Sequence, residues 1–208
     1  MNIEHVMRLA PVVPVLVIDD ATLARPLAEA LVAGGVFAIE VTLRTPAALD
    51  VIREMTAVEG AVVGAGTVLN EVQLDAALAA GARFIVSPGL TERLVRAAAE
   101  RGTAFLPGVA NASDIMRGLN LGLFRFKFFP AEASGGVPAL KALSAPFTDA
   151  RFCPTGGVTM ANAPAYLRLP STLCVGGSWI VRDDTLRARD WPRISELARQ
   201  AASLQVTS

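Results

Sequence analysis

Glycine recurs at nearly constant intervals along this sequence, and that recurrence limits the possible folds more than any other feature. Gly35, Gly60, Gly81, Gly102 and Gly122 are separated by 25, 21, 21 and 20 residues. Each glycine follows an Ala- or Leu-rich stretch of helical character and precedes an apolar, β-branched one. This order is typical of a helix, a glycine C-cap and a strand. Repeated helix and strand units predict an α/β fold with parallel strands.

Eight apolar segments fit the strands of this repeat. They span residues 12–18, 38–43, 61–67, 83–88, 103–108, 123–129, 151–157 and 172–178. Eight parallel strands favour closure into one (β/α)8 TIM barrel, and residues 1–10 are expected to form a short N-terminal helix or arm. A doubly wound open sheet is the alternative, although the segment after the first strand, IDDATLA, lacks phosphate-binding glycines. A single domain over residues 1–208 is expected.

Charge and composition restrict the kind of partner. The 19 Lys and Arg residues balance 19 Asp and Glu residues, so charge gives no reason to expect nucleic acid or a membrane surface. With Cys153, Cys174 and His5 as its only cysteines and histidine, the chain is poorly equipped for a metal centre or a histidine-assisted nucleophile. The apolar runs are shorter than the roughly 20 residues of a membrane span, and the first residues lack a signal-peptide pattern. We expect a cytoplasmic protein that acts on a small molecule.

A lysine in the sixth predicted strand is directed into the barrel. In LFRFKFF (residues 123–129), alternation directs Arg125, Lys127 and Phe129 inward. Phe124, Phe126 and Phe128 are then expected to face the helices. An uncharged lysine amine can attack a ketone. Neighbouring phenylalanines, together with Arg44 and Arg125, are expected to favour that uncharged form.

A glutamate in the second predicted strand faces the same interior. In AIEVTLR (residues 38–44), Glu40, Thr42 and Arg44 alternate inward. Strands two and six are both even-numbered, so Glu40 and Lys127 can share one interior layer. Such a pair can also serve packing alone. Polar or irregular residues at three other strand ends, Thr67, Pro88 and Thr155, favour a functional layer over a purely structural one.

Two glycine pairs follow the last two strands. PTGG ends in Gly156 and Gly157, and VGGS contains Gly177 directly before Ser178. Glycine lets backbone N–H groups approach an anion closely, and barrel enzymes commonly bind phosphate in the loops after strands seven and eight. Ordinary turns use the same dipeptide. The position of both pairs favours a phosphate site, with the Ser178 hydroxyl as a further donor.

Seven segments resemble the family of bifunctional aldolases for 2-keto-3-deoxy-6-phosphogluconate (KDPG) and 4-hydroxy-2-oxoglutarate. They are, in order, ALVAGGV, IEVTLRT, VGAGTVLN, SPGLTE, FKFFPAE, FCPTGGV and LCVGGSW. The resemblance implies a class I lyase of Entner–Doudoroff carbohydrate metabolism. Such an enzyme cleaves KDPG to pyruvate and glyceraldehyde 3-phosphate, and 4-hydroxy-2-oxoglutarate to pyruvate and glyoxylate. A homotrimer is implied as well.

The resemblance also implies a role for each candidate residue. Lys127 forms a Schiff base with the substrate's C2 ketone, and Glu40 is the general acid and base. The remaining residues bind the pyruvoyl end (Arg44 and Thr67), shape the pocket (Pro88, Phe129 and Thr155) and hold the phosphate (Gly156, Gly157, Gly177 and Ser178). No metal or other cofactor is implied, because the protonated imine is the electron sink.

One part of the resemblance selects a substrate, and another departs from the family pattern. Thr155 favours the gluconate over the galactonate isomer, whose aldolases carry an apolar residue there. In PGVANASD (residues 107–114), Ala110 and Asn111 replace small hydroxyl residues of a PGISTxSE-like segment. Two other functions remain possible at this point. They are another phosphate-binding barrel enzyme, such as the 6-phosphogalactonate aldolase, an epimerase or an isomerase, and a non-catalytic barrel that binds a sugar phosphate.

Overall fold

Parallel strands alternate with helices through residues 1–206, which the computed structural model describes. The strands are β1 (Val12–Leu16), β2 (Ala38–Thr42), β3 (Val62–Gly66), β4 (Phe84–Val86), β5 (Ala104–Leu106), β6 (Gly108–Val109), β7 (Arg125–Phe128), β8 (Arg151–Pro154) and β9 (Val175–Gly177). The helices are α1 (Ile3–Met7), η1 (Ala21–Leu23), α2 (Ala24–Ala33), α3 (Ala48–Thr56), α4 (Glu71–Ala79), α5 (Glu92–Glu100), α6 (Ala112–Asn120), α7 (Gly136–Ser144), α8 (Ala163–Leu167), α9 (Asp183–Arg187) and α10 (Trp191–Ala202).

The strands form a curled parallel sheet in two sections. One section has six strands in the order β5-β4-β3-β2-β1-β9, and the other has three in the order β6-β7-β8. Isolated parallel bridges, Phe152 with Thr172 and Thr155 with Gly176, connect the β8 and β9 regions. The order from β5 to β1 contains no reversal, whereas a doubly wound sheet reverses its strand order next to the first strand. The doubly wound alternative is therefore wrong.

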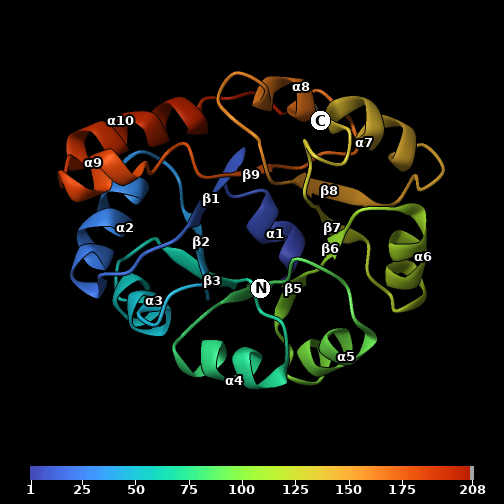
Figure 1. The fold of residues 1–208 in the computed structure, drawn as a ribbon, viewed down its shortest axis with the longest axis horizontal. Coiled ribbons are helices and arrows are strands. Elements are labelled where there is room, and N and C mark those ends of the chain that lie inside the picture. Colours follow the sequence, from blue (N-terminus) through green and yellow to red (C-terminus); the bar gives the residue numbers. More distant parts are fainter. Residues whose placement is uncertain (207–208) are drawn as a thin grey trace.

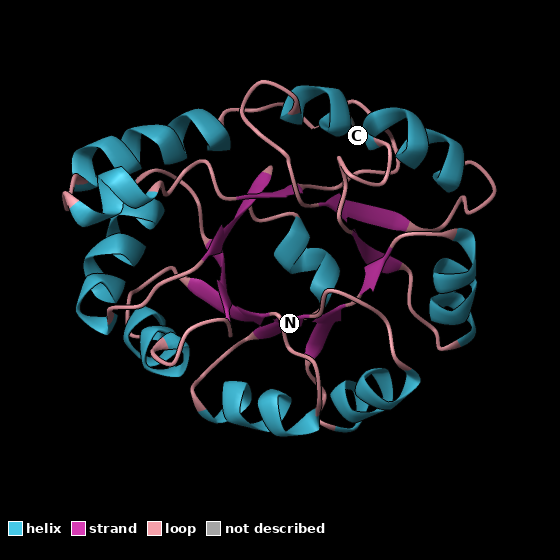
Figure 2. Ribbon diagram, viewed as in Figure 1, coloured by secondary structure: helices cyan, strands magenta, loops and turns pink. Residues whose placement is uncertain are grey.

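The helices lie on one side of this curled sheet. The strands surround a central space in Figures 1 and 2, and α2 to α10 are arranged around their outside. Figure 1 shows that α1 differs, because it projects over the centre of the ring. No helix within residues 1–206 combines the length and apolarity required to cross a bilayer.

Four of the five recurring glycines directly follow the C-cap of a helix, as the sequence predicts, whereas Gly60 lies in a turn beyond the Ala57 C-cap of α3. The φ angles of all five are 85°, 85°, 99°, 61° and 79°, in the left-handed region that favours glycine. After α2, the N–H groups of Gly35 and Val36 donate to the carbonyls of Val32 and Leu31. This is the hydrogen-bond pattern with which a glycine ends a helix. The recurring glycines are thus explained by backbone conformations that other residues rarely adopt.

The strand with the predicted range 103–108 is divided at Pro107. Proline has no N–H to donate to a strand ladder, and β5 ends directly before it while β6 begins directly after it. The Pro107 carbonyl still accepts a hydrogen bond from the Lys127 N–H. A second difference concerns Phe124, which was expected to pack under the helices. It precedes β7 and is 44% exposed.

The interior of the ring has its own small core, which α1 covers at the amino ends of the strands. Val6 and Met7 of α1 are each 1% exposed and pack in one cluster with Val13, Phe84 and Leu106. At the same end, the Arg125 Nε donates to Glu4 Oε2 over 3.0 Å. Helix α1 is the expected N-terminal helix, and it closes the end of the ring opposite the strand carboxyl ends.

Candidate active site

The structure brings Lys127 and Glu40 together inside the ring. The Lys127 Nζ lies 3.0 Å from Glu40 Oε1 and 3.3 Å from Oε2. The two residues are only 5% and 3% exposed. They come from β7 and β2, which belong to different sections of the sheet. Their meeting confirms that both side chains point inward, as alternation along each strand predicts.

Close packing fixes the Glu40 carboxylate from the neighbouring strand. Glu40 is paired with Gly64 in the β2 and β3 register, and Gly66 follows on the same face. A Cβ atom on Gly66 would overlap the Glu40 carboxylate. The absence of a side chain at Gly66 therefore lets the carboxylate lie flat against β3 and reach Lys127.

The two cysteines are buried close to this pair. Cys153 lies beside Lys127 in the register of β7 and β8, and both Cys153 and Cys174 are buried free thiols. A hydrogen bond from Cys174 is the main cause that lowers the pKa of Cys153, against the opposing effect of burial. Both thiols belong to the interior core, as expected for reduced cysteines.

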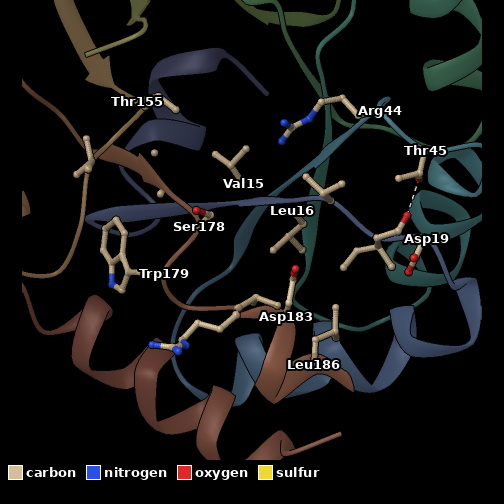
Figure 3. Close-up of a pocket in the computed structure, with 18 of the residues that line it drawn as sticks. Val15, Leu16, Asp19, Arg44, Thr45, Thr155, Ser178, Trp179, Asp183 and Leu186 are labelled. Atoms are coloured by element: carbon tan, nitrogen blue, oxygen red, sulfur yellow. Dashed lines mark hydrogen bonds between the residues drawn. The ribbon is translucent and has the colours of Figure 1, made fainter. Parts of the chain in front are cut away.

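A cavity of about 1020 Å³ opens at the carboxyl ends of the strands. Its lining includes Leu16 at the end of β1, Phe129 after β7 and Gly177 at the end of β9. Figure 3 shows that it extends past Trp179 toward Asp183. Parallel barrel enzymes carry their active sites at this end. The cavity is therefore the place where a substrate is expected.

Most of the predicted site residues line this cavity. The residues that do so are Arg44, Phe129, Thr155, Gly156, Gly157, Gly177 and Ser178. The Lys127 and Glu40 pair lies beneath them and is not part of the lining. Phe129 joins the two layers, since its ring lines the cavity and its ring centroid is 5.5 Å from the Lys127 Nζ. Phe129 therefore places the amine close to the cavity wall.

Two of the predicted residues, Thr67 and Pro88, lie outside the cavity lining. Thr67 directly follows β3 and has a φ of 58°, a conformation that a β-branched residue rarely adopts. Such strain costs about 1–3 kcal/mol and is common near functional sites. Pro88 follows β4, and its carbonyl packs closely against Gly108. A side chain on Gly108 would overlap the Pro88 carbonyl. Both residues follow the carboxyl ends of strands, on the side of the sheet where the cavity opens.

The two glycine pairs serve the cavity for different physical reasons. Gly156 and Gly157 have φ angles of 99° and 78°, so their loop requires glycine conformations. Gly176 and Gly177 have no such angle. Instead, a Cβ on Gly176 would overlap the Thr155 hydroxyl, and one on Gly177 would overlap the Trp179 ring. The first pair shapes a loop, and the second makes room for side chains.

Several residues that sequence reasoning missed support this wall of the cavity. The Glu132 N–H donates to the Gly156 carbonyl over 3.0 Å, and the Tyr166 hydroxyl donates to Glu132 Oε1. Burial, and then the hydrogen bond to Glu132, raises the pKa of Tyr166. The indole N–H of Trp179 is buried and has no partner within residues 1–206. The motifs FKFFPAE and LCVGGSW contain Glu132 and Trp179, but only their tertiary contacts reveal these roles.

Metal ligands are sparse in the described chain. Residues 1–206 contain no group of three or more His, Cys, Asp or Glu side chains placed to hold a metal ion.

The parallel sheet is curled, and a buried lysine and carboxylate lie beneath a cavity at the carboxyl ends of its strands. This arrangement defines an α/β enzyme with the active site that is typical of barrel folds. The comparison with known families is specific. A family model described as "KDPG and KHG aldolase" matches residues 3–197. The chain belongs to this aldolase family.

Individual relatives agree with the family match along almost the full chain. The 2-dehydro-3-deoxy-phosphogluconate aldolase of Zymomonas mobilis is 58% identical over 98% of this chain and 97% of its own length. A crystal structure of the Z. mobilis aldolase with 3-phosphoglycerate has a TM-score of 0.96 and 57% identity, covering 99% of this chain and 97% of that one. The Legionella pneumophila KDPG aldolase, with pyruvate captured as a covalent carbinolamine, has a TM-score of 0.94 and 45% identity, covering 98% and 99%.

Proposed function

We propose that this protein is a class I aldolase that cleaves KDPG to pyruvate and glyceraldehyde 3-phosphate, with Lys127 as the Schiff-base residue. The observation that carries the proposal is the contact between the Lys127 Nζ and Glu40 Oε1, 3.0 Å apart beneath the cavity. A class I aldolase needs an amine nucleophile and an adjacent acid and base. The membership of the chain in the KDPG and KHG aldolase family supports this assignment.

The first half of the reaction joins Lys127 to the substrate. A proton passes from the lysine to Glu40, and the free amine attacks the C2 ketone. The oxygen of the resulting carbinolamine takes a proton from Glu40 and leaves as water. An iminium ion remains, and it draws electrons from the neighbouring bonds. Glu40 reaches the nitrogen with both oxygens, 3.0 and 3.3 Å away, so it is well placed for these transfers.

The second half breaks the carbon–carbon bond. Glu40 removes the proton of the C4 hydroxyl, the C3–C4 bond breaks, and its electron pair moves to the iminium nitrogen through C3 and C2. Glyceraldehyde 3-phosphate leaves as the aldehyde, and the enamine of pyruvate remains on Lys127. Protonation at C3 and hydrolysis by water then release pyruvate and restore the amine.

The cavity residues hold the two ends of the substrate in this proposal. Arg44 binds the carboxylate next to C2, with Thr67 beside it, because guanidinium groups bind carboxylates through paired N–H donors. Phe129, Thr155 and Pro88 shape the middle of the pocket. The phosphate lies against Gly156, Gly157, Gly177 and Ser178. Cleavage of 4-hydroxy-2-oxoglutarate, which has no phosphate, uses the lysine and the carboxylate site alone.

The two sections of the sheet are proposed to be one closed (β/α)8 barrel. In this description β5 and β6 are two halves of the fifth strand, separated by Pro107. The bridges of Phe152 with Thr172 and of Thr155 with Gly176 then join the seventh strand to the eighth. Pairing of Gly108 with Lys127 closes the remaining gap. Residues 1–208 are proposed as one domain, although residues 207 and 208 lie outside the described part.

The proposed assembly is a homotrimer, supported by the family resemblance. Light scattering is expected to give three times the chain mass of 21.8 kDa. A mass equal to one chain would contradict the trimer. A role in Entner–Doudoroff metabolism, a reaction without a metal or other cofactor, and a cytoplasmic location remain predictions.

The decisive experiment traps the intermediate. The protein is incubated with pyruvate and borohydride, which reduces an imine to a stable amine, and its peptides are analysed by mass spectrometry. We expect one reduced pyruvate adduct on the peptide that carries Lys127, and none in Lys127→Ala. Lys141→Ala is the control, because Lys141 lies on α7 and is exposed, outside the cavity lining. An adduct that persists in Lys127→Ala would overturn the assignment.

A further inference from the structure

Within residues 1–206, one hydrogen bond fixes the guanidinium of Arg44. Its Nε donates to the Thr42 hydroxyl over 3.1 Å. Its two terminal nitrogens have no protein hydrogen-bond acceptor or ion-pair partner within residues 1–206, and the side chain lines the cavity. Figure 3 shows the guanidinium of Arg44 extending toward the side of the cavity where Thr155 lies. Four N–H donors are thus left for a ligand.

The Thr42 hydroxyl is itself fixed in direction. It donates to the carbonyl of Leu16 on β1 over 2.8 Å, and Thr42 is 2% exposed. A hydroxyl has one donor hydrogen and two acceptor lone pairs. Since the hydrogen is committed to Leu16, a lone pair faces Arg44. Two hydrogen bonds therefore connect the Leu16 carbonyl of β1, the Thr42 hydroxyl and the Arg44 guanidinium in series.

This chain of bonds determines how the guanidinium is presented. A guanidinium is planar, so an anchored Nε leaves the edge formed by the two terminal nitrogens facing away from Thr42. Paired donors on one edge match the two oxygens of a carboxylate. Without the anchor, a long arginine side chain must lose more conformational entropy when it binds.

We propose that Thr42 is a positioning residue that holds Arg44 in the orientation needed to bind the substrate carboxylate. This inference rests on the proposed function, because it assumes that Arg44 binds the carboxylate of the pyruvoyl end. Thr42 bonds to Arg44 and to the Leu16 carbonyl, and it is not among the residues that line the cavity. Its loss is therefore expected to weaken substrate binding far more than turnover.

The test replaces the hydroxyl by a methyl group of the same shape, in Thr42→Val. We expect KM for KDPG to rise about tenfold, the effect of losing about 1.4 kcal/mol of binding, with kcat within about threefold of wild type. The pyruvate concentration for half-maximal trapping on Lys127 is expected to rise by a similar factor. Thr42→Ser keeps the hydroxyl and is expected to restore both values to within about twofold.

A double-mutant cycle separates positioning from general loss of structure. In an Arg44→Ala background, Thr42→Val is expected to have no further effect on KM, because both changes remove the same interaction. The matched stability control is Thr45→Val. The Thr45 hydroxyl donates to the carbonyl of Ile18, on the same segment as Leu16. The melting temperatures of the Thr42 and Thr45 variants are then compared.

Three outcomes would overturn the proposal: an unchanged KM in Thr42→Val, an equal rise in the Arg44→Ala background, or a serine variant that behaves like the valine variant. If Thr42→Val does not fold, Thr42→Ala removes the same hydroxyl and repeats the test. The proposed function fails separately. In that case wild-type protein would give no pyruvate adduct on Lys127, whereas failure of the Thr42 proposal leaves wild-type trapping intact.

Discussion

At the scale of single residues, the buried contact between Lys127 and Glu40 makes stability sensitive to either residue. Removing one partner of a buried charge pair leaves the other uncompensated and typically costs about 3–5 kcal/mol. Such a pair is weak evidence of function by itself. The proposed role also rests on the nearby cavity, because Phe129 lines it and the centroid of the Phe129 ring is 5.5 Å from the Lys127 Nζ.

Glu40→Gln separates proton transfer from packing. Glutamine keeps the size of the side chain and a hydrogen-bond acceptor for Lys127, but it cannot take up the proton. We expect kcat for KDPG cleavage to fall by about 10²- to 10⁴-fold, the usual contribution of general acid–base catalysis. Pyruvate release in steady state measures this, and circular dichroism checks the fold. A folded variant with kcat within threefold of wild type would contradict the role of Glu40.

Gly157→Ala is predicted to affect the phosphorylated substrate selectively. The φ of 78° is strained for alanine, and its Cβ would lie 2.7 Å from the Glu132 Cβ, so the loop must move. We expect KM for KDPG to rise about tenfold, equivalent to about 1.4 kcal/mol, with little change for 4-hydroxy-2-oxoglutarate.

Gly102→Ala is the matched control for Gly157→Ala. Gly102 has a φ of 61°, but a Cβ there meets no atom within 4 Å, and it lies after α5, outside the cavity lining. The Gly102→Ala variant therefore introduces backbone strain without displacing the loop that contains Gly157. Equal changes in KM for both substrates in Gly157→Ala would argue against a phosphate site in this loop.

Sequence reasoning identified the residues whose identity alone indicates their task. Glu40 and Lys127 are charged positions inside largely apolar strands, and Gly157 belongs to a pair at a predicted loop. Alternation also predicted that Thr42 faces inward, but neither Thr42 nor Gly66 signalled a task, because glycine and threonine are ordinary in strands. Their importance depends on distances across the sheet, from Gly66 to the Glu40 carboxylate and from Thr42 to Arg44.

At the scale of helices and strands, a polar residue directly before a helix is expected to cap it, and the sequence suggests Thr45, Thr91, Asn111 or Ser113, and Asp190 for this role. Thr91, Asn111 and Asp190 each accept a hydrogen bond from a first-turn N–H of α5, α6 and α10. Thr45 was also expected to be a cap, and this was wrong. Helix α3 begins only at Ala48, and the Thr45 hydroxyl bonds to Ile18 instead. The competing partner is the Ile18 carbonyl in the segment after β1, a residue distant in the sequence that local patterns do not reveal.

The departure from the family pattern at Asn111 is explained by its cap. Asn111 Oδ1 accepts from the Asp114 N–H over 3.0 Å, and Asp114 Oδ2 accepts from the Ala110 N–H over 3.1 Å. Asparagine, serine and threonine are all good cap residues. The side chains differ from the small hydroxyl residues of the family, but the start of α6 is retained.

Removal of this cap is expected to affect stability. Asn111→Ala should lower the free energy of unfolding by about 1 kcal/mol, while Asn111→Ser should be close to wild type. Urea unfolding followed by circular dichroism measures both variants. If serine destabilised the protein as much as alanine does, the cap hydrogen bond could not be the reason for the loss.

At the scale of the whole molecule, the ring of strands was predictable and its two-section sheet was not. The glycine period indicates repeated helix and strand units with parallel strands. The division at Pro107 depends on one missing N–H, and β9 pairs regularly with β1 but meets the β8 region through isolated bridges. Closure of a ring is a property of all its strands together, so no single segment predicts it.

The attachment of α1 to the ring is expected to depend on pH. Hydrogen bonds from Arg125 and then Arg8 lower the pKa of Glu4 in the folded protein. A lowered carboxyl pKa adds stability above the unfolded value, about 4.3 for glutamate, and this stability is lost as the pH falls through the lower folded value. Glu4→Gln is therefore expected to cost up to about 1 kcal/mol at pH 7, since the pair is partly exposed.

Urea unfolding at several pH values measures this difference. The gap between wild type and Glu4→Gln should be full at pH 7 and should shrink as the pH falls below about 4. Glu59→Gln is the control, because Glu59 is exposed and has no ion-pair partner within residues 1–206. A gap that stays constant down to pH 3 would mean that the charge of Glu4 does not stabilise α1.

The position of α1 also bears on the path of a ligand. Val6 and Met7 fill the interior at the amino ends of the strands, whereas the cavity opens at their carboxyl ends. In the proposed mechanism pyruvate stays bound to Lys127 until the aldehyde has left, so the aldehyde is expected to depart first through this cavity.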